Sequence, residues 1–155
     1  MGLRNLFRQR KQPDYSDGVI DLYRLNRPSP PSYLQFGETL YWKITETGKK
    51  DTAGEISLRL GEGVGIYYYG HVGYHVDPPY RGHGYAVRAC RLIAQYARKA
   101  GKGSLVITTD PDNLASRKTC EHLGCYLERQ VTLTEQMQRK LDLPAEKCRY
   151  ILILS

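Results

Sequence analysis

The sequence has no long apolar run and no cysteine arrangement that would hold a metal. It contains no stretch of about 18 apolar residues, the length that a membrane-spanning helix needs. Its first residues lack the apolar stretch and cleavage site of a secretory signal. The four cysteines form no CxxC pair, which argues against zinc. We therefore expect a cytoplasmic protein with reduced thiols, no membrane segment and no bound metal.

The composition is that of an ordinary globular chain with an excess of basic residues. Its 155 residues are 41% hydrophobic and 25% charged, which suits one domain with one core. The formal net charge is +7, and four basic residues lie before residue 13. We expect residues 1–16 to be a flexible basic segment and residues 17–155 a single domain. The other basic residues are spread along the chain, so a nucleic-acid-binding domain is the weaker interpretation.

Short segments separated by turns fill the first half of the chain. Apolar and polar residues alternate over 19–25 and 54–60, and 39–45 is rich in aromatic and β-branched residues. The segment 67–76 also predicts a strand. These four strands in succession predict an antiparallel meander.

The second half changes to helical spacing. Apolar residues recur every three or four positions from Ala86 to Ala100, which predicts a helix that stops at Gly101. Further predicted elements are strands at 105–109, 126–133 and 149–154 and helices at 115–123 and 135–141. A helix between two strands implies at least one parallel pair. The predicted fold is α/β or α+β, with a mixed, mostly antiparallel central sheet of about seven strands flanked by helices.

The turn between the strand ending at Val76 and the helix starting near Ala86 predicts an anion site. Gly82 and Gly84 allow a tight turn, and the first amides of a helix have no internal partner. Together with the helix dipole and the charge of Arg81, these amides favour phosphate. The turn is neither a dinucleotide fingerprint nor a Walker loop, because position 87 is Val and no Gly-Lys-Ser/Thr follows.

Two blocks resemble the GNAT acetyltransferases. The segment Arg81–Ala86 is similar to that family's Arg/Gln-x-x-Gly-x-Gly/Ala motif. A second block at the expected distance resembles the family's Asn-x-x-Ala/Ser…Tyr-Glu-Lys-Leu-Gly-Phe segment through Asn113, Ser116, Glu121, Leu123 and Gly124. The similarity covers about residues 54–134. It implies an acyl-CoA N-acyltransferase-like fold and transfer of acetyl from acetyl-CoA to the primary amine of a small molecule or protein.

The resemblance also implies how acetyl-CoA is held. The strands 67–76 and 105–109 should splay apart, with the pantetheine arm pairing along the strand that ends at Val76 and the pyrophosphate on the turn amides. The residues expected to bind the co-substrate are His75, Val76, Arg81, Gly82, His83, Gly84, Tyr85, Ala86, Asn113 and Ser116.

Acyl transfer needs a neutral amine, a stabilised oxyanion and a proton for the leaving thiolate. The resemblance gives the oxyanion to the amide of His75 or Val76. The usual position of the carboxylate base aligns with Gly70 or His71, neither of which is acidic. His71 is therefore the first candidate for the base, and Glu55 on the neighbouring strand is the second.

The family's usual acid is a tyrosine, and the matching position is Cys120. This thiol is either the proton donor or a small residue packed in the core, and Tyr74 or Tyr126 could supply a hydroxyl instead. Residues 26–38 are too short for the two helices that wall the acceptor site in most of the family. The acceptor site is thus either wide or completed by a second subunit. The departures from the family pattern leave a non-catalytic acyl-CoA-binding module as the alternative function.

Overall fold

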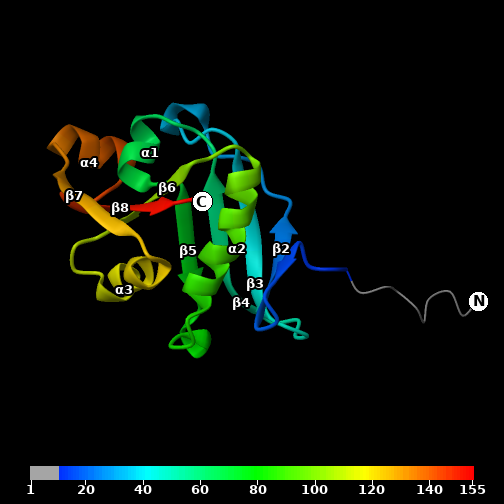
Figure 1. The fold of residues 1–155 in the computed structure, drawn as a ribbon. Coiled ribbons are helices and arrows are strands. Elements are labelled where there is room, and N and C mark those ends of the chain that lie inside the picture. Colours follow the sequence, from blue (N-terminus) through cyan, green and yellow to red (C-terminus); the bar gives the residue numbers. More distant parts are fainter. Residues whose placement is uncertain (1–10) are drawn as a thin grey trace, which may run out of the picture.

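The computed structural model describes residues 11–155, so most of the predicted basic segment lies outside the described residues. Residues 15–16 of that segment form a short strand. The order of elements is β1 (Tyr15–Ser16), β2 (Ile20–Leu25), the 3-10 helix η2 (Ser32–Leu34), β3 (Thr39–Glu46), β4 (Thr52–Arg59), α1 (Val64–Tyr69), β5 (Val72–Val76), the 3-10 helix η3 (Pro78–Tyr80), α2 (Tyr85–Lys99), β6 (Ser104–Thr109), α3 (Leu114–Leu123), β7 (Tyr126–Thr132), α4 (Glu135–Leu141) and β8 (Glu146–Ile153) (Figure 1).

The strands form two sheets. The first has five strands in the order β1-β2-β3-β4-β5, and the second has three in the order β6-β8-β7. The predicted class and the antiparallel meander of the first half are confirmed. The expected parallel pair is wrong for the described residues, because every strand ladder there is antiparallel. The reason is that β5 and β6, the strands joined by α2, separate into different sheets instead of pairing.

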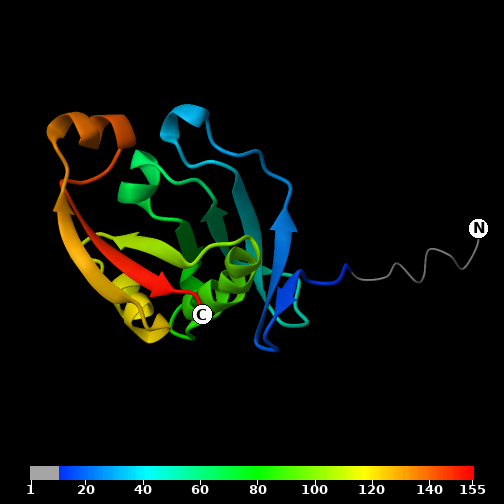
Figure 2. The same cartoon turned by 45° about the horizontal axis from the view of Figure 1, so that its top comes forward.

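The predicted strand 67–76 is wrong over its first five residues, because β5 begins only at Val72. Tyr67 to Tyr69 belong to helix α1, which ends at Gly70 with φ +80°. Tertiary packing overrides the strand preference of three tyrosines here. Tyr69 packs edge-on against Phe36, with ring centroids 5.0 Å apart, and the Arg149 guanidinium lies 3.9 Å from the centre of the Tyr67 ring. Figures 1 and 2 show α1 at one end of the molecule, between η2 and α4.

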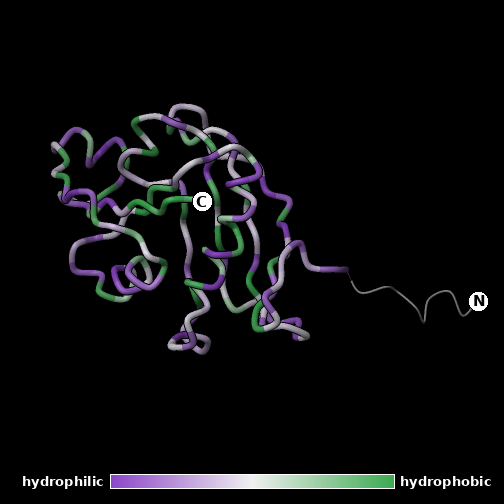
Figure 3. The backbone as a smooth tube through the Cα atoms, in the orientation of Figure 1, coloured by the Kyte–Doolittle hydropathy of each residue, from purple (hydrophilic) through white to green (hydrophobic). Residues whose placement is uncertain are grey.

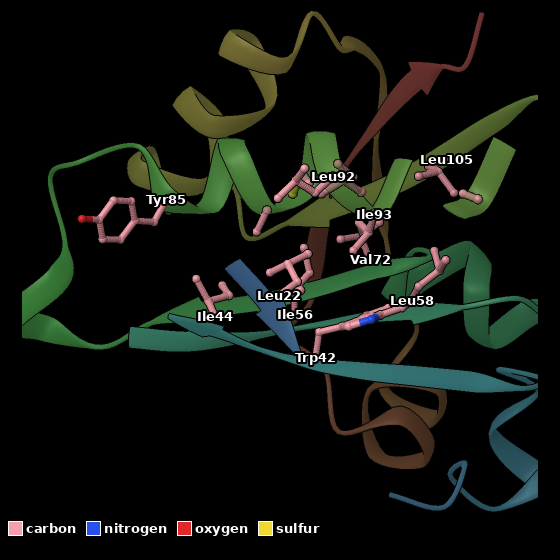
Figure 4. Packing of buried hydrophobic residues seen from close by; sticks show 14 of the residues in the cluster. Leu22, Trp42, Ile44, Ile56, Leu58, Val72, Tyr85, Leu92, Ile93 and Leu105 are labelled. Atoms are coloured by element: carbon pink, nitrogen blue, oxygen red, sulfur yellow. The ribbon is translucent and has the colours of Figure 1, made fainter. Parts of the chain in front are cut away.

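The main core lies between α2 and the five-stranded sheet. Alternation puts Leu22, Ile44 and Ile56 on one face of the sheet, and the apolar stripe of α2 packs onto them. Figure 4 shows Leu92 and Ile93 of α2 pointing toward these strand residues. Trp42 is fully buried and packs edge-on against Tyr96 of α2, with ring centroids 5.7 Å apart. In Figure 3 the loop before α2 is mostly hydrophilic, whereas the C-terminal half of β8 is hydrophobic.

The two sheets meet at the beginning of β5. A single bridge joins Gly70 to Ile107, and a Cβ on Gly70 would lie 2.7 Å from the carbonyl oxygen of Val106. The His71 amide donates to that carbonyl at 2.7 Å, and the Val106 amide donates to Nδ1 of His71 at 2.9 Å. His71 thus satisfies both backbone groups of Val106, and β5 and β6 diverge beyond this point.

The tautomer of His71 follows from these bonds. Because Nδ1 accepts a hydrogen bond, the ring proton is on Nε2, which lies 2.7 Å from the carboxylate of Glu62. Burial lowers the pKa of His71 below its ordinary value of 6.5, and the attraction of Glu62 offsets only part of that effect. Protonating Nδ1 would place two donors face to face.

We expect this histidine to make stability depend on pH. Its folded-state pKa is lower than its unfolded-state pKa, so its contribution is complete above pH 6.5 and is lost as pH falls toward the folded-state value. The wild-type free energy of unfolding should fall between pH 7.5 and pH 5.5, by at most about 1.4 kcal/mol per pH unit from this group. The slope should be smaller in His71→Gln. Urea unfolding followed by circular dichroism measures both, and parallel slopes would contradict the assignment.

Candidate functional site

A groove of about 560 Å³ runs between β5, the turn before α2, the start of α2 and helix α3. Nine of the ten residues that the sequence predicted for co-substrate binding lie around it, and only His83 does not. These nine are His75, Val76, Arg81, Gly82, Gly84, Tyr85, Ala86, Asn113 and Ser116. The structure therefore brings the two sequence blocks, about 30 residues apart, to opposite walls of one groove.

The helix start at the groove is not capped by the described part of the chain. Gly84 is the N-cap of α2 in the left-handed conformation, with φ +73°, and no side chain accepts a hydrogen bond there. The first bond of the helix runs from the Arg88 amide to the Gly84 carbonyl. Within the described residues the amides of Tyr85, Ala86 and Val87 consequently have no protein acceptor. Such amides, at the positive end of a 15-residue helix, attract an anion.

Side chains anchor this helix start in place. Arg81 donates through Nε to the Val76 carbonyl at 2.8 Å, which ties the turn to the end of β5. The Tyr85 hydroxyl donates to the carboxylate of Glu46 at 2.5 Å, and Figure 4 shows that hydroxyl pointing away from the core. The ring of His83 lies beside that of Tyr85, with centroids 5.5 Å apart. Arg81 and Tyr85 thus both line the groove and hold the turn in place.

Seven further residues line the groove without having been predicted as binding residues. They are Tyr74, Tyr80, Val87, Ala115, Lys118, Thr119 and His122. Those on α3 recur every three or four positions, so helical spacing from Asn113 and Ser116 could have found them. Lys118 adds a positive charge to the wall opposite α2, which further favours an anionic ligand.

The free edge of β5 also faces the groove. The Asp77 amide donates to the carbonyl of Ala53 in β4. By strand alternation the amide of His75 therefore faces β4, whereas those of Tyr74 and Val76 face the free edge. Of the two amides predicted to stabilise an oxyanion, the geometry favours Val76.

Tyr74 crosses the groove from β5 to α3. Its hydroxyl lies 3.0 Å from Oγ of Ser116, and burial raises its pKa to about 12. Like an ordinary tyrosine, this phenol is protonated at neutral pH, and its hydroxyl can donate a hydrogen bond. Asn113 is the N-cap of α3, since its side-chain oxygen accepts from the Ser116 amide at 3.1 Å. These bonds fix both α3 residues that the sequence predicted.

His71 does not lie where the sequence placed it. His71 was predicted to lie in the strand 67–76, but it precedes β5 and is 3% exposed. It does not line the groove, and both ring nitrogens already have partners in Val106 and Glu62. Its geometry is that of a contact between the sheets rather than of a base.

Glu55, the second candidate for the base, is also engaged. Arg27 binds both its carboxylate oxygens at 3.0 Å and lowers its pKa. Glu55 pairs with His75 across β4 and β5 but does not line the groove. A carboxylate that forms a bidentate ion pair with an arginine is a poor proton acceptor.

Cys120 occupies the position of the family's acid but lies inside the core. It is 0% exposed and does not line the groove. Its interaction with Cys125 and its burial raise the pKa of the Cys120 thiol well above its ordinary range. The placement favours the second of the two interpretations offered by the sequence, a small residue packed under α3.

Other site types find no support in residues 11–155. This part of the chain contains no group of three or more metal-ligating side chains close together. No helix in it is both long and apolar enough to span a bilayer.

Comparison with known families and structures gives a consistent result. A family model for the acetyltransferase (GNAT) domain matches residues 14–126. The microcin C7 self-immunity acetyltransferase, solved with acetyl-CoA and AMP, is 21% identical with a TM-score of 0.57 over 74% of this chain and 61% of its own. The ribosomal-protein-S5-alanine acetyltransferase from Vibrio fischeri is 20% identical with a TM-score of 0.59 over 76% of this chain and 62% of its own.

A third structure is the Salmonella typhimurium acetyltransferase that modifies the N-terminal serine of ribosomal protein L7/L12. It is 18% identical, with a TM-score of 0.58 over 76% of this chain and 64% of its own. The chain thus spans less than two thirds of the length of these three proteins. The comparison with curated proteins finds no match.

The uncapped amides make Gly84 the sharpest test of the groove. Val at this position would strain a left-handed residue by about 1–2 kcal/mol and put a branched side chain beside the amides. We expect Gly84→Val to weaken binding of coenzyme A at least about tenfold in calorimetry.

Gly101 provides a matched control. It follows the other end of α2, has φ +92° and also has open space where a Cβ would lie. Gly101→Val should therefore carry similar backbone strain but leave the affinity for coenzyme A unchanged. Equal affinities of wild type and Gly84→Val would remove the anion site from the turn.

Proposed function

The chain belongs to the GNAT acetyltransferase family, and on that basis we propose that it transfers an acetyl group from acetyl-CoA to a primary amine by direct attack in a ternary complex. The observation that supports this most strongly is the coincidence of three features in one groove. These are the uncapped amides at the start of α2, the free edge of β5 and the side chains of α3. Residues 17–155 would act as one acetyltransferase domain.

Each wall of the groove has a distinct part in holding acetyl-CoA. The amides of residues 85–87 suit the pyrophosphate, because they add hydrogen bonds to the field of the helix. Lys118 and Arg81 add charge from either side. The free edge of β5 offers backbone groups at Tyr74 and Val76 to the amides of the pantetheine arm, as a neighbouring strand would.

The reaction needs one proton donor and one acceptor. The amine nitrogen bonds to the thioester carbonyl carbon, the carbon–sulfur bond breaks, and the thiolate takes a proton while the nitrogen loses one. We assign the donor to Tyr74, because it lines the groove and its hydroxyl, 3.0 Å from Oγ of Ser116, carries a proton that it can donate. His71, Glu55 and Cys120 are each held by other partners or buried.

No dedicated base is required for an α-amino acceptor. Its reference pKa of about 7.7–8.0 leaves a useful neutral fraction at pH 7–8, and water can take the proton after attack. Two of the compared structures are acetyltransferases that act on ribosomal proteins. We therefore include protein amino groups with small amines among the acceptors to be tested.

The engaged states of His71, Glu55 and Cys120 favour a second candidate, a non-catalytic acyl-CoA-binding module. A screen of amino acids, polyamines, aminoglycosides and peptide N-termini, followed by release of free thiol from acetyl-CoA, separates the two. Thiol release that depends on an amine supports the transferase. Tight binding of coenzyme A without release across the screen supports the binding module.

Two substitutions decide the proton donor once an acceptor is found. Tyr74→Phe should lower kcat by about 10²–10⁴-fold and leave the affinity for coenzyme A nearly unchanged. Cys120→Ala should keep kcat within a factor of about two, because the thiol does not reach the groove. Steady-state kinetics on both variants measures this, with circular dichroism to verify folding. A slow Cys120→Ala beside a normal Tyr74→Phe would reverse the assignment.

A further inference from the structure

The face of the five-stranded sheet opposite α2 carries an arginine that the groove does not use. Ile56 and Leu58 of β4 point into the core beneath α2. By alternation Ser57 and Arg59 point to the other face, where both are partly exposed. Ser57 pairs with Gly73 of β5, so this region lies across β5 from Tyr74.

Arg59 has no acidic partner in the described part of the chain. Its one hydrogen bond there runs from Nη1 to the Gly70 carbonyl at 3.1 Å. Four other arginines each lie within 4.0 Å of a carboxylate: Arg27 near Glu55, Arg88 near Asp17, and Arg129 and Arg149 near Glu128. A partly buried cation without a counter-ion favours a ligand that brings one.

Two aromatic rings pack against the guanidinium of Arg59. Its carbon lies 4.8 Å from the ring centre of Phe36 and 5.5 Å from that of Tyr69. Nε and Nη2 of Arg59 form no hydrogen bond with any described residue, yet neither atom is fully buried. The two donors on this edge of the guanidinium therefore keep some solvent exposure and have no protein acceptor in the described part of the chain.

Because Gly73 has no side chain, the donors of Arg59 can lie close against β5. A Cβ at this position would lie 3.0 Å from both Nη2 of Arg59 and Oγ of Ser57. The guanidinium of Arg59 and the hydroxyl of Ser57 therefore both lie against Gly73 of β5, which has no side chain. This is the same strand whose other face and free edge line the groove.

We propose that Arg59, Ser57 and Gly73, with Phe36 and Tyr69 as walls, bind a carboxylate of the acceptor amine. We call these five residues the Arg59 cluster. The proposal rests on the proposed function, and it names the acceptor class as an amine that also carries a carboxylate. The paired N–H groups of a guanidinium match the two oxygens of a carboxylate, and a neutral amide cannot replace that charge. Free amino acids and acidic peptides both present this chemistry.

The first test measures binding without turnover. Protein labelled with ¹⁵N at arginine is titrated with glycine against glycinamide, and with the peptide Ser-Asp-Gly-amide against Ser-Asn-Gly-amide. We expect a saturable shift of the Arg59 Nε–H resonance with the carboxylate member of at least one pair and none with its amide. Glycine and the peptide separate a free amino acid from an acidic peptide. Absence of a saturable shift with both carboxylates overturns the proposal.

Variants distinguish the bidentate geometry of Arg59 from its charge, and both of these from an effect on folding. Arg59→Gln should weaken carboxylate binding at least about tenfold, and Arg59→Lys should restore part of it, since it keeps the charge but not the fork; both are followed by calorimetry. Arg27→Gln is the matched control, because Arg27 lies on the same face but is already paired with Glu55. Equal affinities of wild type and Arg59→Gln would contradict the proposal.

Binding of acetyl-CoA by the same samples reports on the proposed function separately. Carboxylate binding without acetyl-CoA binding would keep the Arg59 cluster and remove the acetyltransferase. Acetyl transfer at equal rates to glycine and glycinamide, or to both peptides, would keep the enzyme and remove the cluster.

Discussion

The contact of Gly70 and His71 with Val106 and Ile107 is the constraint on which the site depends. It joins the two sheets at the beginning of β5 and nowhere else along that strand. Beyond this contact β5 keeps a free edge, because β6, the next strand in the sequence, belongs to the other sheet. An edge strand inside a protein is normally covered, since its backbone groups would otherwise lack partners. Here that edge lines the groove, where a ligand can pair with it.

The parts of the site that the sequence predicted are those set by local rules. The turn at Gly82–Gly84 requires residues that tolerate positive φ, and helical spacing identifies α2 and α3 without knowledge of any contact. Both blocks of the GNAT resemblance lie on these elements. Lys118 and His122 line the same groove as Ser116 and could have been found by the same helical spacing.

The parts that the sequence did not predict are set by partners distant in the chain. Glu55 looks free in sequence, but Arg27, 28 residues away, holds it. In the sequence His71 falls within a predicted strand, but in the structure the amide of Val106, 35 residues later, donates to its ring. The three tyrosines of α1 have strand preference, yet packing against Phe36 and Arg149 makes them helical. In each case burial and pairing, rather than residue type, decide the role.

The short length of β5 links the two proposed sites. Its five residues alternate between the α2 face, which carries Tyr74, and the opposite face, where Gly73 lies beside Arg59. The two faces communicate where β6 has moved away, because no paired strand separates them there. An acceptor bound at Arg59 would therefore have to reach its amine around that edge toward Tyr74. The distance between carboxylate and amine in the acceptor, and not only their presence, would then decide which acceptors can react.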